Sequence, residues 1–215
     1  MTNKVFVFDL DDTLYKEIDY KISGFKHLIF LLSNLFPDNK CKVSVQDILY
    51  LEDPLEYLIN IYKLNSASKE SLLWAYRTHH PDIHLNSEVK SVLDEFKVKE
   101  VPTIIITDGR ELTQQLKIKS LGLSHIPSLI SESYNEVKPG LKRFEKISKE
   151  YPSATKYYIG DNLEKDFLAP NQLEWVTIGI TPDKDNIHKS ELTNLHEKYF
   201  PDYWIDSFSQ LKDFL

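Results

Sequence analysis

The feature that most constrains this chain is a recurring pattern in which a short apolar run ends in a polar loop. The runs read KVFVFD, PTIIITDG, PSLIS, KYYIGDN and EWVTIGIT, with YWI near the carboxyl end as a weaker addition. They are rich in Val, Ile, Phe and Tyr, and they are apolar at consecutive rather than alternate positions. Such runs are typical of strands in a parallel sheet that is covered on both faces.

Segments with helical spacing separate these runs from about residue 85 onward. The segment LNSEVKSVLDEFK offers Asn86 or Ser87 as its N-cap residue, ELTQQLKIKSLGL stops at Gly122, and PGLKRFEKISKEY opens with Pro139. Strands and helices therefore alternate along the chain. This alternation predicts an α/β fold, with a doubly wound, Rossmann-like parallel sheet.

The stretch before this region has a different pattern. It contains the helical segments YKISGFKHLIFLLSNLF, VQDILYLEDPLEYLINIYKL and SKESLLWAYRTHH, and it is too long for a simple crossover connection. We predict an inserted α-helical domain at residues 15–82 and an α/β core formed by residues 1–14 and 83–215. Aromatic residues at helical spacing are expected in the core of the insert, namely Tyr50, Tyr57, Tyr62, Trp74 and Tyr76.

Composition excludes several classes of function. The formal net charge is −7 over 215 residues, which argues against a nucleic-acid partner because such binding needs a concentrated basic face. Cys41 is the single cysteine, so no intrachain disulfide forms. No stretch approaches the roughly 18 apolar residues of a membrane span, and no secretory signal is visible. We expect a soluble, cytoplasmic protein that binds neither membranes nor nucleic acid. Its oligomeric state stays open.

Polar residues that could take part in catalysis or ligand binding follow several of the apolar runs. They are Asp9, Asp11 and Thr13 after the first run, Thr107 in IIITDG, Lys138 in NEVKPG, and Asp161 and Asp166 in YIGDNLEKD. Open α/β sheets bind their ligands at the carboxyl ends of strands. Clustered carboxylates need a hard cation, and oxygen ligands suit Mg²⁺ together with a phosphate group. A phosphate dianion can approach Asp9 only if Mg²⁺ and Lys138 offset the negative charges.

At this point the sequence resembles the haloacid dehalogenase-like (HAD) superfamily. The segments DLDDT, a Thr that ends a later apolar run, KP and GDNLEKD match its motifs in order, over residues 1–14 and about 83–215. The insert stands where subfamily I phosphatases carry a helical cap. The similarity is greatest to small-molecule phosphatases of the phosphoglycolate phosphatase, β-phosphoglucomutase and nucleotidase type.

The resemblance implies a role for each matching residue. Asp9 would be the nucleophile and a Mg²⁺ ligand, and Asp11 the acid/base, with its backbone carbonyl on the metal. Asp161 would ligate Mg²⁺ directly, while Asp166 would act through water or by holding Lys138. The residues expected to contact the phosphate are Thr13, Thr107, Asp108, Gly109 and Lys138.

One position departs from the family pattern. After Thr107 the family often has Asn, whereas this chain has Asp108. An extra carboxylate near a phosphate adds repulsion unless Arg110 pairs with it.

The sequence thus predicts a Mg²⁺-dependent phosphatase that hydrolyses a small phosphomonoester through an aspartyl-phosphate, with the cap closing over the cleft. A nucleotide, a sugar phosphate and phosphoglycolate all remain candidate substrates. The carboxylate of Asp11 favours phosphoryl chemistry, because dehalogenases of the superfamily lack it and need no metal. Two alternatives remain: a phosphomutase of the β-phosphoglucomutase type, and a catalytically inactive binding protein of the same fold.

Overall fold

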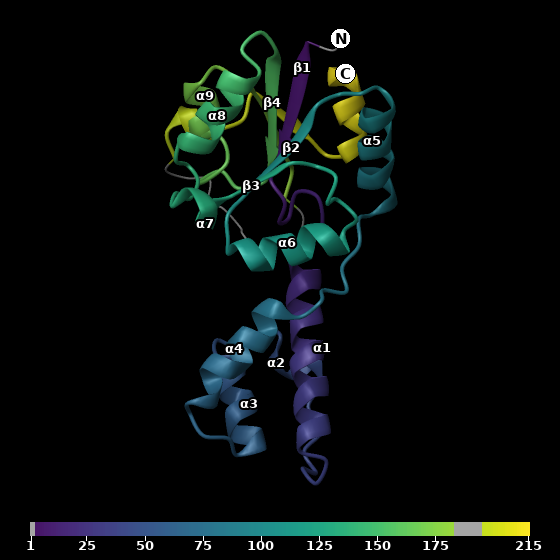
Figure 1. Ribbon diagram of the computed structural model, residues 1–215, viewed down its shortest axis with the longest axis vertical. Helices are drawn as coiled ribbons and strands as arrows, with labels where there is room; N and C mark the ends of the chain where they lie inside the picture. The colour runs from purple at the N-terminus through teal and green to yellow at the C-terminus, as the bar shows by residue number, and fades with distance from the viewer. Residues whose placement is uncertain (1–2, 183–194) are drawn as a thin grey trace. The chain divides into compact units, whose positions relative to one another are not determined.

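The computed structural model describes residues 3–182 and 195–215, and its α/β part is built on one six-stranded sheet. The strand order is β3-β2-β1-β4-β5-β6, and every neighbouring pair is parallel (Figure 1). The strands are β1 (Lys4–Phe8), β2 (Thr103–Thr107), β3 (Ser128–Ile130), β4 (Thr155–Gly160), β5 (Val176–Ile180) and β6 (Tyr203–Ile205). The predicted doubly wound sheet is therefore confirmed. From β1 the strand order runs through β2 to β3 on one side, and from β4 it runs through β5 to β6 on the other side. The strand order therefore reverses between β1 and β4, and doubly wound sheets bind their ligands at such a point.

Helices cover both faces of this sheet (Figure 1). One face carries α8 (Lys142–Glu150) and α9 (Leu168–Gln172), and the other carries α5 (Ser87–Val98) and the 3₁₀ segment η2 (Phe208–Phe214). The remaining elements of the α/β part are α6 (Glu111–Ser120), α7 (Ser131–Tyr134) and η1 (Glu197–Tyr199).

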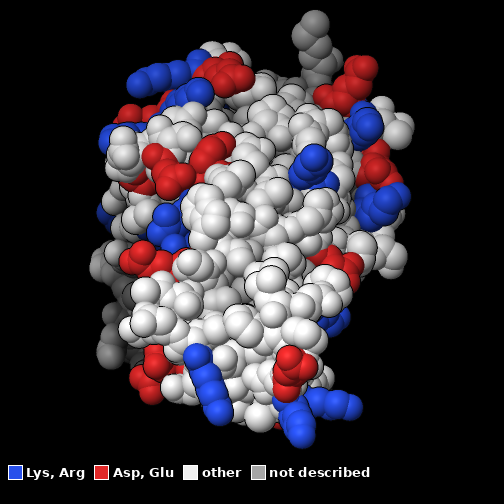
Figure 2. Space-filling view, turned by 60° about the horizontal axis from the view of Figure 1, so that its bottom comes forward, with Lys and Arg blue, Asp and Glu red and all other residues white. Residues whose placement is uncertain are grey.

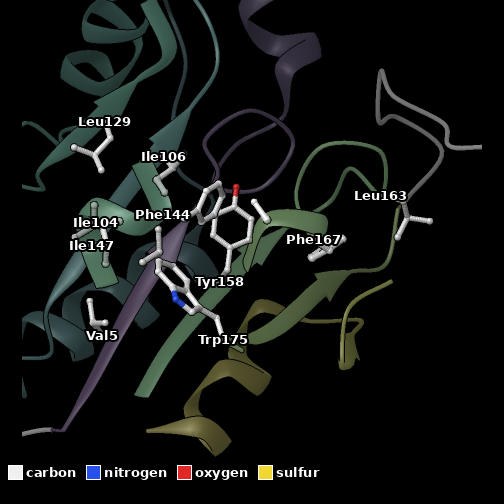
Figure 3. Packing of buried hydrophobic residues seen from close by; sticks show 12 residues of the cluster. Val5, Ile104, Ile106, Leu129, Phe144, Ile147, Tyr158, Leu163, Phe167 and Trp175 are labelled. Carbon is white, nitrogen blue, oxygen red and sulfur yellow. The ribbon is translucent and has the colours of Figure 1, made fainter. Parts of the chain in front are cut away.

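The central strand shows why its sequence is continuously apolar. Val5 and Val7 belong to the buried cluster that includes Phe144 of α8, and Figure 3 shows Val5 and Phe144 within that layer. Phe6 points to the opposite face, where its ring centroid lies 4.6 Å from that of Phe96 in α5. Successive side chains of a strand face opposite ways, so a strand buried on both faces needs apolar residues at every position.

Local signals set some of the helix ends. Asn86, rather than Ser87, caps α5, because its Oδ1 accepts a hydrogen bond from the Val89 amide at 2.8 Å. Gly122 follows α6 with φ +75°, a conformation that favours glycine. The helix expected to open at Pro139 begins later, at Lys142.

The chain divides into two compact units, Met1–Glu17 together with His84–Leu215, and Ile18–Ile83. The second unit holds nearly all of α1 (Glu17–Leu35), together with α2 (Val45–Ile48), α3 (Pro54–Tyr62) and α4 (Ser68–Thr78). We call it the helical unit and the first the α/β unit. The core of the helical unit contains Phe25, Leu28, Leu32, Ile48, Leu49, Leu58, Ile59, Tyr62 and Leu72.

The prediction of an aromatic core in the helical unit is partly wrong. Tyr62 is buried, but Tyr50 is 84% exposed and Trp74 is 61% exposed. Tyr50 follows α2 in the segment where the expected long helix breaks before α3 begins at Pro54. Trp74 lies two positions from the buried Leu72, on the opposite side of α4, because residues of a helix share a face at spacings of three or four.

In the view of Figure 2, Lys and Arg side chains are mixed with Asp and Glu side chains mainly near the edge of the drawn face, and much of its centre is white. That view shows no extended basic area. In the described part of the chain, no helix combines the length and the apolar character needed to cross a bilayer.

Candidate active site

Six of the nine sequence-predicted residues line one cavity of the α/β unit, at the carboxyl ends of β1, β2 and β4, whereas Thr13, Gly109 and Asp166 lie outside its lining. The cavity has a volume of about 130 Å³. A water molecule needs about 10–15 Å³ of such a volume, so the cavity has room for a phosphoryl group and an ion. Its lining residues are Asp9, Asp11, Glu17, Thr107, Asp108, Lys138, Asp161, Asn162 and Lys165.

Lys138 is the positive centre of this site. Its Nζ donates hydrogen bonds to Asp9 Oδ1 and Asp166 Oδ1, both at 2.6 Å, and to the Tyr158 hydroxyl at 3.2 Å. Burial alone would lower the pKa of Lys138, but the carboxylates of Asp166 and Asp9 raise it well above its usual value. The ammonium group is therefore permanently charged, which makes the buried carboxylates tolerable.

Both oxygens of Asp166 are occupied by the protein. Oδ1 accepts from Lys138 and from the Tyr158 hydroxyl at 2.9 Å, and Oδ2 accepts from the amides of Asp161 and Asn162. Gly160 permits this approach, because a Cβ at that position would lie 2.5 Å from Asp166 Oδ2. Of the two roles expected for Asp166, these contacts match the one in which it holds Lys138.

Three carboxylates form an acidic cluster at the cavity, which Asp9 and Asp161 line and behind which Asp166 is buried. Asp9, Asp161 and Asp166 each offer an oxygen, and these atoms all lie within 4.8 Å of one another. Burial, together with the nearby carboxylates, raises the pKa of Asp161 to about 9. Burial also raises the pKa of Asp9 to about 7, although Lys138 acts in the opposite direction. Both pKa shifts have the direction expected of buried carboxylates that lie close together, where the charged form is disfavoured.

Asp161 provides the clearest indication of a metal ligand. Its Oδ1 accepts a hydrogen bond from Thr13 Oγ1 at 3.2 Å, which fixes the carboxylate. Its Oδ2 is buried and has no hydrogen-bond partner among the described residues. Buried carboxylate oxygens are normally satisfied, and oxygen-only donor sets suit Mg²⁺. The residues present therefore fit a magnesium ion.

Asp11 is held on the other side of the cavity by residues that the sequence reading did not select. Lys117 Nζ donates to its Oδ1 at 2.8 Å, Gln114 Nε2 donates to its Oδ2 at 2.9 Å, and the Tyr15 hydroxyl donates to Oδ1. Burial would raise the pKa of Asp11, but the charge of Lys117 and these hydrogen bonds hold it below its usual value. Gln114 also contacts Thr107 Oγ1 at 2.6 Å.

A sequence signal for two of these residues existed in α6. Its buried positions are Gln114, Lys117, Ile118 and, just after the helix, Leu121, which follow the i, i+3, i+4, i+7 spacing of an inward face. Two polar residues on an inward face mark a site with buried partners. Asp12, the third acid of DLDDT, binds the backbone rather than the cavity. It has φ +56°, and its Oδ1 accepts a hydrogen bond from the Glu17 amide.

The loop after β2 is fixed by hydrogen bonds. Asp108 pairs with Arg143 at 2.6 Å, whereas Arg110, the cation considered for it, is exposed. The amide of Gly109 donates to Ser131 Oγ at 2.9 Å, and a Cβ at Gly109, where φ is +148°, would lie 3.0 Å from the Gln114 side chain. Arg143 and Ser131 were both absent from the predicted site.

Comparison with known proteins identifies the family. The profile of the haloacid dehalogenase-like hydrolase family matches residues 6–180. The chain belongs to this family. No curated protein matches the sequence.

Solved structures of HAD proteins share the fold at low sequence identity. A putative HAD hydrolase from Bacillus subtilis bound to magnesium is 17% identical, with a TM-score of 0.65 over 100% of this chain and 99% of that one. A 2-haloacid dehalogenase from Pseudomonas syringae is 21% identical, with a TM-score of 0.63 over 99% and 97%. A predicted phosphoglycolate phosphatase from Haemophilus somnus is 15% identical, with a TM-score of 0.60 over 100% and 99%.

Proposed function

We propose that this HAD hydrolase is a Mg²⁺-dependent phosphatase that acts on a small phosphomonoester, such as a nucleotide, a sugar phosphate or phosphoglycolate. The observation that carries the proposal is the placement of two carboxylates with different environments on one small cavity. Asp9 lies against Lys138 within the acidic cluster, and Asp11 lies apart from it against Lys117. The HAD neighbours include both dehalogenases and phosphatases. The second carboxylate favours phosphoryl transfer, because dehalogenases of the superfamily lack it.

In the first step, a carboxylate oxygen of Asp9 attacks the phosphorus atom. The bond from phosphorus to the ester oxygen breaks, and Asp11 donates a proton to the departing oxygen, so the alcohol leaves and an aspartyl-phosphate remains. Lys138, held by Asp166 and Tyr158, keeps Asp9 in position and offsets negative charge on the phosphoryl oxygens.

In the second step, a water oxygen attacks the phosphorus of the aspartyl-phosphate. Asp11, now ionised, takes a proton from that water, the bond from phosphorus to Asp9 breaks, and inorganic phosphate leaves. Lys117 and the hydrogen bonds to Asp11 lower its pKa and so favour the ionised form, which is the form that accepts a proton. To donate a proton in the first step, Asp11 must be protonated. The negative charge of the incoming phosphate dianion raises the pKa of Asp11 and so favours its protonated form.

Asp9 and Asp161 would hold the magnesium ion, with the backbone carbonyl of Asp11 as a further ligand and Asp166 behind them. When bound, the ion would supply positive charge that offsets the acidic cluster and polarises the phosphoryl group. The orphaned Oδ2 of Asp161 supports this assignment.

The test is hydrolysis of p-nitrophenyl phosphate, followed by a panel of phosphorylated metabolites. We expect activity that requires Mg²⁺ and that falls by at least about 10³-fold in Asp9→Asn, because the nucleophile is lost. Asp94→Asn is the matched control, since Asp94 is a surface carboxylate of α5 whose side chain is 62% exposed. Activity that survives in Asp9→Asn would refute the mechanism.

The same experiments separate the alternatives. A phosphomutase would show isomerisation that depends on a sugar bisphosphate and little net hydrolysis. A binding protein without turnover would stay inert toward the whole panel in the presence of Mg²⁺.

A further inference from the structure

We infer that Asp108 and Arg143 form a matched pair that keeps a carboxylate in the phosphate-binding loop without repelling phosphate. Arg143 would thereby act as a positioning residue for Thr107 and Lys138. The inference rests on the proposed phosphatase function, and it assigns a role to a residue that the motifs do not include.

Arg143 is placed where helical spacing calls for an apolar residue. It lies on the inward face of α8 beside Phe144 and Ile147, and its side chain is fully buried. A buried guanidinium is unfavourable unless it is paired, so its partners explain why it is there. Its Nη2 donates to Asp108 Oδ1 at 2.6 Å, and its Nη1 donates to the carbonyl of Thr107 at 2.9 Å.

These two contacts fix consecutive residues of the loop after β2. The guanidinium is planar and presents its donors as a rigid fork, so one side chain can hold both a backbone carbonyl and a carboxylate. Thr107 and Asp108 are both part of the cavity lining. Arg143 therefore approaches the loop from the core, on the side away from the cavity.

Asp108 in turn binds the backbone of Lys138. The amide of Lys138 donates to both carboxylate oxygens of Asp108, at 3.2 and 3.0 Å, and its Nζ contacts Asp9 at 2.6 Å. A continuous set of contacts thus runs from Arg143 through Asp108 to the proposed nucleophile. The negative charge of Asp108 is directed toward Arg143 and the Lys138 amide, which reduces its repulsion of a phosphate in the cavity.

The pairing also accounts for the departure from the family pattern at position 108. A neutral Asn there needs no buried cation. An Asp needs one, and a buried Arg needs an anion, so each residue of the pair requires the other.

The experiment is a double-mutant cycle with Asp108→Asn, Arg143→Met and the double variant, with Arg110→Met as the matched control on the same loop. Each protein is assayed for its thermal midpoint, for binding of inorganic phosphate by calorimetry in the presence of Mg²⁺, and for kcat and KM with p-nitrophenyl phosphate. We expect Arg143→Met to weaken phosphate binding by about tenfold or more and to raise KM, because Asp108 is then uncompensated. The double variant should return to within about threefold of the wild type, and Arg110→Met should match the wild type.

Rescue of Arg143→Met by Asp108→Asn supports the pair, and so does a single variant that fails to fold while the double variant folds. Additive losses overturn it, as does a double variant that fails to fold along with Arg143→Met, since Arg143 would then be needed independently of Asp108. A wild-type protein that hydrolyses no phosphomonoester refutes the proposed function instead, because the thermal midpoints and phosphate binding still decide whether the two residues are coupled.

Discussion

The two units of the chain bury different kinds of side chain. Among the described residues, the buried polar and charged groups of the helical unit are Ser23 and His79, whereas those of the α/β unit include Asp9, Lys138 and Arg143. Both units expose large apolar residues: the α/β unit exposes Val98, Leu112, Val137, Tyr203 and Trp204, and the shorter helical unit exposes seven. Those of the helical unit are Phe30, Leu35, Phe36, Tyr50, Leu51, Tyr57 and Trp74.

The contrast separates two sources of stability. The helical unit depends on an ordinary apolar core, in which each buried methylene contributes through removal from water. The α/β unit has an apolar core as well, but it also holds ionised groups whose cost of burial is offset by specific partners. Changes in the two units should therefore differ in size and in their dependence on metal and pH.

The largest effect on stability is expected from Lys138→Met. Removing this ammonium group leaves buried Asp9 and Asp166 without their cation, which should lower the free energy of unfolding by about 3–5 kcal/mol in the absence of divalent ions. Urea denaturation at pH 8 measures it. Lys165→Met is the control, since Lys165 is an exposed residue at the same cavity and should change stability by less than about 0.5 kcal/mol. Equal stability of the Lys138→Met and Lys165→Met proteins would show that the buried ion pairs are not a separate source of stability in the α/β unit.

A pair of substitutions tests the apolar core of the helical unit. Leu58 is fully buried, so Leu58→Ala should cost about 2–5 kcal/mol of unfolding free energy through lost burial and a residual cavity. Trp74→Ala removes a larger side chain that is 61% exposed, and it should cost no more than about 0.5 kcal/mol. A Trp74 variant as unstable as Leu58→Ala would show that this face of α4 is covered.

Magnesium should stabilise the α/β unit through its acidic cluster. An ion at about 100 times its dissociation constant adds about 2.7 kcal/mol to the unfolding free energy. A thermal-shift titration should show this gain in the wild type and in Leu58→Ala, but show most of it lost in Asp161→Asn, whose position carries the unpartnered Oδ2. A full gain in Asp161→Asn would exclude that oxygen as a ligand.

The smallest effect concerns acid stability. Hydrogen bonds from Ser207 and from the Ser209 amide lower the pKa of Glu88, which lies at the start of α5. The stabilisation is present above the unfolded-state pKa of about 4.3 and is lost as the pH falls through the lower folded-state pKa. Its size is at most about 1 kcal/mol, because the group is partly exposed.

Glu88→Gln should therefore flatten the acid limb of the stability profile, as measured by urea denaturation between about pH 2 and pH 6. Glu52 is an exposed residue of the helical unit, and Glu52→Gln should leave the acid limb unchanged. An unaltered acid limb in Glu88→Gln would contradict the assignment.

Sequence reasoning located the six strands of the described residues and the polar residues that follow β1, β2 and β4, because both signals are local. A continuous apolar run is visible in consecutive residues, and an acid that follows it marks the strand end. The same reasoning failed for Tyr50 and Trp74, where helical spacing left open which face packs inward. It also missed Gln114, Lys117 and Arg143, since a polar residue is assigned to the surface unless its partner is known.

The sequence by itself determined the parallel α/β architecture, the helical insert and the acidic groups at the strand ends. Only the tertiary structure decided which charges meet. Lys117 and Asp11 are 106 positions apart, and Arg143 and Asp108 are 35 positions apart. The physical reason is that burial of an apolar residue is favourable against almost any neighbour, whereas burial of a charge is tolerable only beside one specific partner, which the folded chain alone supplies.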